Sequence, residues 1–325
     1  MIWIEFLICA SLMTYFAYNL CKEGIVVAEK THLDEGVIGM FFLAVATSFP
    51  EIVTGAAAVS VLGKVGLGFG DIAGSVIANF MILAALDYCS GRGRILSKVS
   101  ELNKTTGIFV ISIAGLVLIS ALSRFAGLNI PSFKGIGLES VVIVPIYFVY
   151  LGVIKKGGYS LAGETRLNRE EAFWTMWAKF ALFLCAVMGL GVWMASIGEK
   201  IIVSTGLTET FTGTLILGVT TSLPEIIVSF TALRAASVNM AVGNILGSNL
   251  FDLCIIPFFD VLCRRPILGM LTLGQISAAA IAFILSIIAL WGLFWKKETN
   301  SRLGLDTKII FIVGAVGFVL LYFIK

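Results

Sequence analysis

Two glutamates stand in matching apolar surroundings far apart in the chain. The segment 39-GMFFLAVATSFPEIVTG-55 recurs in altered form as 213-GTLILGVTTSLPEIIVS-229, and each copy places a glutamate, Glu51 or Glu225, directly after a proline. An ionised carboxylate inside a bilayer costs about 2.5–3.5 kcal/mol on insertion scales unless a partner offsets its charge. Because this cost recurs at the same place in both copies, the pair predicts a cation site.

A second pair of matching segments follows the first. The segments 70-GDIAGSVIANFMIL-83 and 243-GNILGSNLFDLCII-256 align at their Gly-Ser steps, which places Asn79 opposite Asp252. Helical spacing of three or four residues puts a hydroxyl on the same face as each polar group: Thr47 and Ser48 with Glu51, Ser222 with Glu225, Ser75 with Asn79, and Ser248 with Asp252. Carboxylate, amide and hydroxyl oxygens suit hard cations such as Na⁺ and Ca²⁺.

The prolines before the glutamates predict breaks in two membrane helices. Pro50 and Pro224 have no N–H to donate to the carbonyl four residues back, so Ala46 and Thr220 lose their helical partners. Irregular backbone at membrane depth is tolerated where it lines a cavity walled by protein. We therefore expect the freed carbonyls to lie beside the cation site.

The composition is that of a membrane protein. Of 325 residues, 58% are hydrophobic and 13% are charged, and the mean hydropathy is +1.01; soluble domains carry about 25% charged residues. The net charge of +3 is dispersed between apolar segments, which argues against nucleic acid as a partner. The six cysteines are scattered, as buried hydrophobes are. The sequence offers no nucleophile–histidine pair, hydrolase metal cluster or phosphate-binding loop, so an enzyme is not expected.

The elements that must position the polar groups are apolar spans. Hydropathy predicts an all-α polytopic protein with ten transmembrane helices near 2–20, 36–61, 68–88, 106–122, 135–153, 173–196, 209–232, 240–262, 270–291 and 307–324. Glu51 and Glu225 lie five spans apart, and an odd separation makes the two copies enter the membrane from opposite sides. This predicts two inverted five-helix repeats, 1–153 and 173–325, joined by a cytoplasmic loop at 154–172.

Basic residues predict the orientation. With ten spans, sixteen Lys and Arg residues fall on one side of the membrane and seven on the other. The richer side should be cytoplasmic, which places both termini outside. The first segment has no basic region or cleavage site of a signal peptide, so it is expected to remain as a span.

At these residues the chain resembles the cation/calcium exchanger superfamily, and within it the prokaryotic sodium/calcium exchanger branch. Its two α-repeat motifs match at 39–83 and 213–256, each with a T-S-x-P-E core followed by a Gly-Ser element. The resemblance implies an antiporter that exchanges Na⁺ for Ca²⁺ by alternating access. The compactness of the chain favours a prokaryotic plasma membrane as its location. The bilayer and the inorganic cations would be its partners; no protein partner and no resident cofactor are expected.

The resemblance also implies roles for individual residues. Glu51, Glu225, Asn79 and Asp252 would be the central ligands. Hydroxyls would support them, together with two backbone carbonyls: Thr47, Ser48, Ser75, Thr221, Ser222, Ser248, Ala44 and Gly218. One position departs from the family pattern, because Val76 stands where the second repeat has Asn249.

Other readings of the same residues stay open. Carboxylates bind protons as well as Na⁺, so H⁺/Ca²⁺ or K⁺-dependent exchange is an alternative. A cation channel would be a different class, but inverted repeats with broken helices favour a carrier. Among the remaining acidic residues, Asp71 is expected to cap its helix near the membrane surface, with a role in cation entry as the alternative. Asp87 and Asp260 are expected to lie at the membrane interface.

Overall fold

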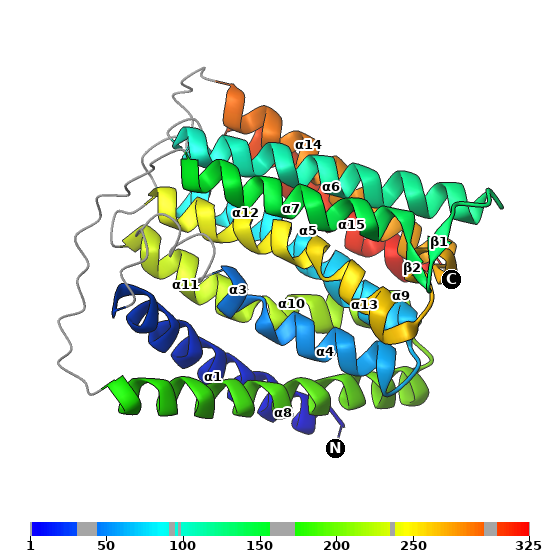
Figure 1. Cartoon of the computed structure of the whole chain (residues 1–325), viewed down its shortest axis with the longest axis horizontal. Coiled ribbons are helices and arrows are strands. Elements are labelled where there is room, and N and C mark those ends of the chain that lie inside the picture. Colours follow the sequence, from blue (N-terminus) through cyan, green and yellow to red (C-terminus); the bar gives the residue numbers. More distant parts are fainter. Residues whose placement is uncertain are drawn as a thin grey trace.

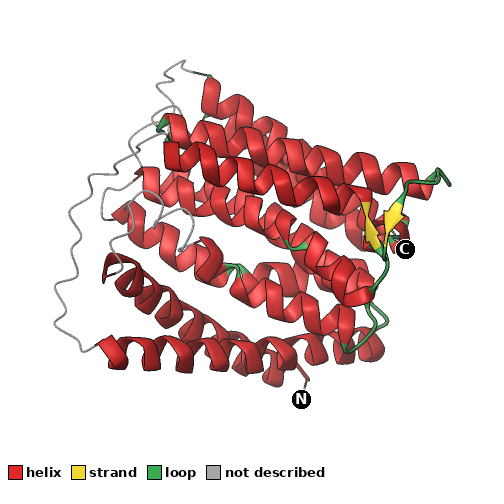
Figure 2. Cartoon of the chain, in the orientation of Figure 1, coloured by secondary structure: helices red, strands yellow, loops and turns green. Residues whose placement is uncertain are grey.

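The computed structural model describes residues 2–30, 44–90, 95–96, 99–156, 173–234, 238–295 and 304–324. Almost all of them are helical (Figure 2). The helices are α1 (Ile2–Lys30), α3 (Ala44–Thr47), α4 (Phe49–Ser60), α5 (Val65–Ser90), α6 (Glu101–Phe125), α7 (Leu138–Lys156), α8 (Phe173–Thr205), α9 (Glu209–Phe211), the π-helix η3 (Thr212–Leu217), α10 (Gly218–Thr221), α11 (Leu223–Arg234), α12 (Val238–Cys254), α13 (Ile256–Cys263), the 3₁₀ helix η4 (Ile267–Met270), α14 (Leu273–Phe294) and α15 (Leu305–Phe323).

The helices include seven that are long and apolar enough to cross a membrane, or eight when the bent run from Glu209 to Arg234 counts as one. Helix α7 contributes a shorter apolar stretch, Leu138–Ile154. The predicted span 36–61 is described only from Ala44, since residues 36–43 lie outside the described part, as do His32 and residues 157–172 of the predicted connecting loop. The chain is thus an all-helical polytopic membrane protein, and the count of ten spans stays a prediction.

One short exception to the helical pattern lies at the end of the bundle where both termini emerge (Figure 1). Strands β1 (Ser132–Phe133) and β2 (Ile136–Gly137) form a two-residue antiparallel ribbon. The turn between them uses Lys134 and Gly135, both at positive φ (50° and 87°), as a type I′ hairpin requires. This ribbon is a local addition that the sequence analysis does not predict, and the all-α fold class is unaffected by it.

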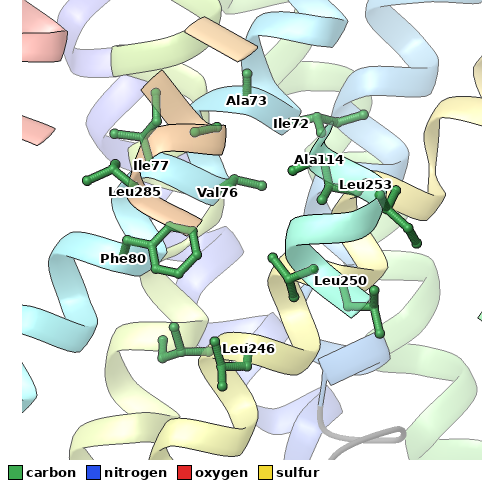
Figure 3. Close-up of a cluster of buried hydrophobic side chains, with 14 of the residues drawn as sticks. Ile72, Ala73, Val76, Ile77, Phe80, Ala114, Leu246, Leu250, Leu253 and Leu285 are labelled. Atoms are coloured by element: carbon green, nitrogen blue, oxygen red, sulfur yellow. The ribbon is translucent and has the colours of Figure 1, made fainter. Parts of the chain in front are cut away.

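The core surrounds α5, which is buried over nearly its whole length. Helices α4, α6, α12, α14, α15 and the π-helix η3 all pack against or around it. Figure 3 shows Val76 and Phe80 of α5 together with Leu246, Leu250 and Leu253 of α12 in one apolar cluster. Since α5 and α12 carry the two Gly-Ser segments, this cluster fixes the polar residues of both segments relative to each other.

Helices α1 and α8 lie side by side along one edge of the bundle, with α6, α7 and α14 at the opposite edge (Figure 1). Exposed apolar residues include Leu7 on α1 and Leu182 on α8 (both 63% exposed) and Ile119 on α6 (65%). In a membrane protein such residues contact lipid, so these helices form the outer wall around α5 and α12.

Asp87 and Asp260 are buried anchors between elements, near the ends of α5 and α13, and their place at the membrane interface stays a prediction. Asp87, near the end of α5, accepts hydrogen bonds from the Ile95 backbone N–H (2.7 Å) and the Thr307 hydroxyl (2.6 Å). Asp260, in α13, accepts from the Ile267 N–H (2.7 Å), the Gly137 N–H (2.9 Å) and the Ser140 hydroxyl (2.7 Å). Each carboxylate ties its own following loop to the first turn of a helix from the other half of the chain.

Candidate functional site

Two helix breaks lie at equivalent places in the two halves. Helix α3 ends and α4 begins around Ser48 (φ −82°, ψ 9°), and α10 ends and α11 begins around Ser222 (φ −80°, ψ 4°). The second break bends its helix by 40°. Pro50 and Pro224 are the second residues of α4 and α11, where the missing proline N–H costs no helical bond. The prolines therefore start new helices whose N-termini lie inside the bundle.

Glu51 and Glu225 stand in the first turns of these two helices, and neither has any exposed surface. A helix N-terminus carries a partial positive charge that favours a carboxylate. Glu51 Oε1 accepts a hydrogen bond from Ser75 (3.1 Å), while Glu225 Oε1 lies 3.3 Å from the hydroxyls of both Ser48 and Ser248. The second oxygen of each glutamate has no hydrogen-bond partner among the described residues.

Ser75 links the two halves at the centre of the site. Its hydroxyl oxygen lies 3.1 Å from Glu51 Oε1, 3.1 Å from Asp252 Oδ2 and 2.8 Å from Ser222 Oγ. Asp252 is buried, and its other oxygen has no partner in the described part of the chain. Asn79, one turn after Ser75, is also buried, and neither its amide nitrogen nor its oxygen is bonded there. The structure thus brings these predicted residues into one buried cluster with unused oxygens.

Two threonines at equivalent positions of the two halves make different contacts. Thr47 Oγ1 lies 3.1 Å from Ser248 Oγ and 3.2 Å from the Ala44 carbonyl. Its counterpart Thr221 instead donates to Asp71 Oδ1 at 3.0 Å, or to the carbonyls of its own helix.

The backbone carbonyls of Ala44 and Gly218, both predicted as ligands, already accept hydrogen bonds. Ala44 receives the Ser48 N–H at 2.9 Å, and Gly218 receives the Ser222 hydroxyl at 2.8 Å. A cation at either carbonyl would have to share it with these donors.

The helix that is broken at Ser222 lies directly against α5, with the two backbones in contact. A β-carbon on Gly74 would lie 2.0 Å from the Thr214 carbonyl oxygen, and one on Gly218 would lie 2.7 Å from the Gly74 carbonyl carbon. Only glycine permits this approach. It is made by the π-helix η3 and α10, and π-helical turns inside α-helices often occur at functional sites. This contact fixes the position of Ser222 along α5, next to Ser75.

The site is negatively charged and built from oxygen. Glu51 is subject to the field of Glu225, Asp252 and Asp71, and none of these four makes an ion pair with a Lys or Arg that the structure describes. Within the described residues no three acidic, histidine or cysteine side chains converge on one metal position, because hydroxyls stand between the carboxylates. The geometry therefore offers several mixed carboxylate–hydroxyl–amide positions and no compact acidic centre.

Three buried polar residues near these elements were not assigned to the site from sequence. Asp71 has no exposed surface and bonds Thr221, so the expectation that it caps α5 is wrong; its place one helical turn before Ser75 was the available signal. Thr54, three residues after Glu51, and Asn249, directly after Ser248, have side-chain polar atoms without partners among the described residues. Asn244, by contrast, is bonded to Ser229 at 2.9 Å.

The pattern of the family described as "Sodium/calcium exchanger protein" matches residues 1–155 and 175–325, which is almost the whole chain. The chain belongs to this family. It is similar to an uncharacterized membrane protein of Methanocaldococcus jannaschii (24% identical, 70% of each chain covered). It is also similar to the inner membrane protein YrbG of Escherichia coli (26% identical; 75% of this chain and 74% of the relative). A third relative is the sodium/calcium exchanger MaX1 of Methanosarcina acetivorans (25%; 72% and 75%).

Solved structures of the family share the fold. The H⁺/Ca²⁺ exchanger CAX superposes with a TM-score of 0.72 at 12% sequence identity, over 99% of this chain and 86% of the other. The sodium–calcium exchanger NCX_Mj superposes with a TM-score of 0.59 at 19% identity, over 98% and 99%. This member of the exchanger family is therefore a transporter and not an enzyme. The identities are too low to carry the choice of coupling ion.

Proposed function

We propose that this protein is a secondary antiporter that exchanges Na⁺ for Ca²⁺ by alternating access. The observation that supports it most directly is the pair Glu51 and Glu225, two buried carboxylates at two helix breaks. Each has one bonded oxygen and one oxygen without a partner in the part of the chain that the structure describes. A buried carboxylate without a counter-charge is unstable, so the site favours bound cations throughout the transport cycle.

In this proposal the predicted residues divide into two groups. Glu51, Glu225, Asn79 and Asp252 bind the ions directly, since each has a buried oxygen without a partner among the described residues. Thr47, Ser48, Ser75, Thr221, Ser222 and Ser248, with the carbonyls of Ala44 and Gly218, supply neutral oxygens around them. Three carboxylates require about two to three positive charges, which one Ca²⁺ with a proton, or several Na⁺, would provide.

The proposed architecture has ten spans in two inverted repeats, 1–153 and 173–325. The two helix breaks, with nearly identical serine dihedral angles, support this symmetry, as do the crossed contacts of Asp87 and Asp260. Both chain ends emerge at the same end of the bundle (Figure 1), as an even number of spans requires. We place this end outside a prokaryotic plasma membrane.

The test is Ca²⁺ uptake into proteoliposomes under separately imposed Na⁺, K⁺ and pH gradients. An opposing Na⁺ gradient should drive Ca²⁺ accumulation. Uptake driven by a pH gradient alone would favour H⁺/Ca²⁺ exchange. A requirement for K⁺ would favour K⁺-dependent exchange. Single-channel currents in planar bilayers would contradict a carrier altogether.

A further inference from the structure

Asp71 is a buried carboxylate that the proposed exchange mechanism does not use. It lies on α5 at the spacing Asp71, Ser75, Asn79, four residues apart each time, so the three side chains form one stripe. Ser75 is the central hydroxyl of the site and Asn79 one of its proposed ligands. Asp71 therefore continues the ion-binding face by one helical turn.

The contacts of Asp71 leave it half satisfied. Oδ1 accepts a hydrogen bond from the Thr221 hydroxyl at 3.0 Å, while Oδ2 is buried without any partner among the described residues. It makes no ion pair with a described Lys or Arg, and its charge reaches both Glu51 and Asp252. An ionised carboxylate in this position needs a positive partner, and the described side chains supply none.

The other half of the chain shows what a neutral version of this position looks like. Asn244 occupies the equivalent place on α12, and its amide donates to the Ser229 hydroxyl at 2.9 Å. The counterpart of Ser229 in the first half is Gly55, which has no side chain to offer. Asp71 thus has an ionisable carboxyl group where Asn244 has a neutral amide, and no equivalent of the serine that bonds Asn244.

We propose that Asp71 and Thr221 form an additional subsite for one monovalent metal cation, Na⁺, next to the exchange site. The carbonyls of Leu217 and Gly218, 3.1 and 3.4 Å from the Thr221 hydroxyl, supply further oxygens. All of these are hard ligands with one negative charge in total, which matches a monovalent ion better than Ca²⁺. The inference rests on the proposed function, and it adds one Na⁺ to each exchange cycle.

The transport test compares wild type with Asp71→Asn, which is close in shape and copies the amide of Asn244. We expect Asp71→Asn to exchange Ca²⁺ with one Na⁺ fewer per cycle, measured as the Ca²⁺ gradient that balances a set Na⁺ gradient at fixed voltage. Thr221→Ala keeps the charge, so it should keep the coupling ratio and raise the Na⁺ concentration for half-maximal rate. An unchanged ratio and Na⁺ dependence in Asp71→Asn would overturn the subsite and leave the exchanger proposal intact.

A second measurement needs neither a variant nor transport. Wild-type protein in detergent is treated with a hydrophobic carbodiimide, which modifies buried carboxyl groups, and the modified residues are located by peptide mass spectrometry. Na⁺ should protect Asp71 several-fold relative to choline at the same pH and ionic strength. Asp87 is the internal control, because both its oxygens are already bonded.

The two experiments separate the two ideas. If Na⁺ protects Asp71 but no Na⁺ gradient drives Ca²⁺ flux, the subsite stands and the proposed coupling fails. Equal modification of Asp71 in Na⁺ and choline overturns the subsite. Protection that follows pH alone assigns the position to a proton and also overturns it.

Discussion

Asp260 Oδ2 lies 2.7 Å from the Ser140 hydroxyl, so a carboxylate of α13 holds the first turn of α7. The same atom accepts the Gly137 N–H, and the other oxygen accepts the Ile267 N–H. One buried side chain thus joins α13, the β-ribbon, the loop after α13 and α7. In the other half Asp87 joins α5, its following loop and α15 in the same way.

Replacing Asp260 by Ala should therefore destabilise the fold without touching the ion site. Three buried donors lose their acceptor, and charged hydrogen bonds contribute about 1.5–3 kcal/mol each without being additive, so we expect a loss of about 3 kcal/mol. Thermal unfolding of the detergent-solubilised protein measures it. Ser140→Ala, which removes one of the three donors, should cost about 1 kcal/mol. Equal stability of Asp260→Ala and wild type would contradict the anchoring role.

Neutralising either site glutamate should abolish exchange. In the proposed mechanism Glu51→Gln or Glu225→Gln removes a charge that binds the cation, and a loss of about 3 kcal/mol corresponds to a roughly hundredfold slower Ca²⁺ flux. Initial rates in proteoliposomes are the readout. Glu5→Gln is the matched control, since Glu5 forms a partly exposed pair with Lys200 on the outer helices, and its flux should stay near that of wild type. Glu51→Gln transporting at the same rate would rule Glu51 out as a ligand.

Adding one methyl group at Gly74 should damage the contact between α5 and the π-helix. Its β-carbon would meet the Thr214 carbonyl at 2.0 Å, and overpacking of this kind costs about 1–3 kcal/mol. We expect Gly74→Ala to unfold at lower temperature and to transport poorly. Gly152→Ala has open space around it and should be neutral, or stabilising by up to about 1 kcal/mol. Similar unfolding temperatures for the two variants would refute the close approach.

Arg124 and Glu139 form a buried bidentate ion pair, with both nitrogen–oxygen distances at 2.9 Å. Removing one partner leaves an unpaired buried charge, so Arg124→Met should lower the free energy of unfolding by about 3–5 kcal/mol. The partly exposed Lys200–Glu5 pair serves for comparison, where Lys200→Met should cost at most about 1 kcal/mol. Chemical unfolding in mixed micelles measures the effect of both substitutions. An equal effect of the two would show that burial of the Arg124–Glu139 pair is unimportant.

The proposed orientation can be tested with single cysteines. The β-ribbon lies at the end of the bundle that carries both termini, while α15 begins at the opposite end (Figure 1). The exposed Lys134 is in the turn of the ribbon, and the exposed Lys308 is in the first turn of α15. In a background without the native cysteines, a membrane-impermeant maleimide should label Lys134→Cys in intact cells and Lys308→Cys only after lysis. The reverse pattern would place the termini in the cytoplasm.

The sequence predicted the family and the polar cluster because both depend on local spacing. The repeated motifs predict four of the site residues: Glu51, Ser75, Glu225 and Asp252. In a helix, side chains three or four residues apart lie on the same face, so the spacing in the motifs is enough to bring polar groups together. Asp71 was misread because its acidic side chain near the start of a span suits a cap equally well. Only the packing of α10 against α5 reveals that it is buried.

The anchors and the π-helix were beyond prediction for a related reason. Asp87 and Asp260 bond to Thr307 and Ser140, residues more than a hundred positions away. The residues around each aspartate do not indicate these distant partners. The ribbon at Lys134 and Gly135 is too short to produce an alternating pattern. Such features depend on tertiary contacts, which single-sequence periodicity does not encode.

The central hydroxyl of Ser75 has three oxygen neighbours but only one hydrogen to give. Ser222 is also committed, since its hydroxyl donates to the Gly218 carbonyl at 2.8 Å. Glu51, Asp252 and the Ser222 oxygen therefore compete for this one hydroxyl hydrogen, and a carboxylate that does not receive it faces a lone pair of Ser75 at 3.1 Å. A cation bound between that carboxylate and Ser75 would attract both oxygens and so remove the repulsion between them. The orientation of the Ser75 hydroxyl thus depends on which carboxylate has a cation bound to it.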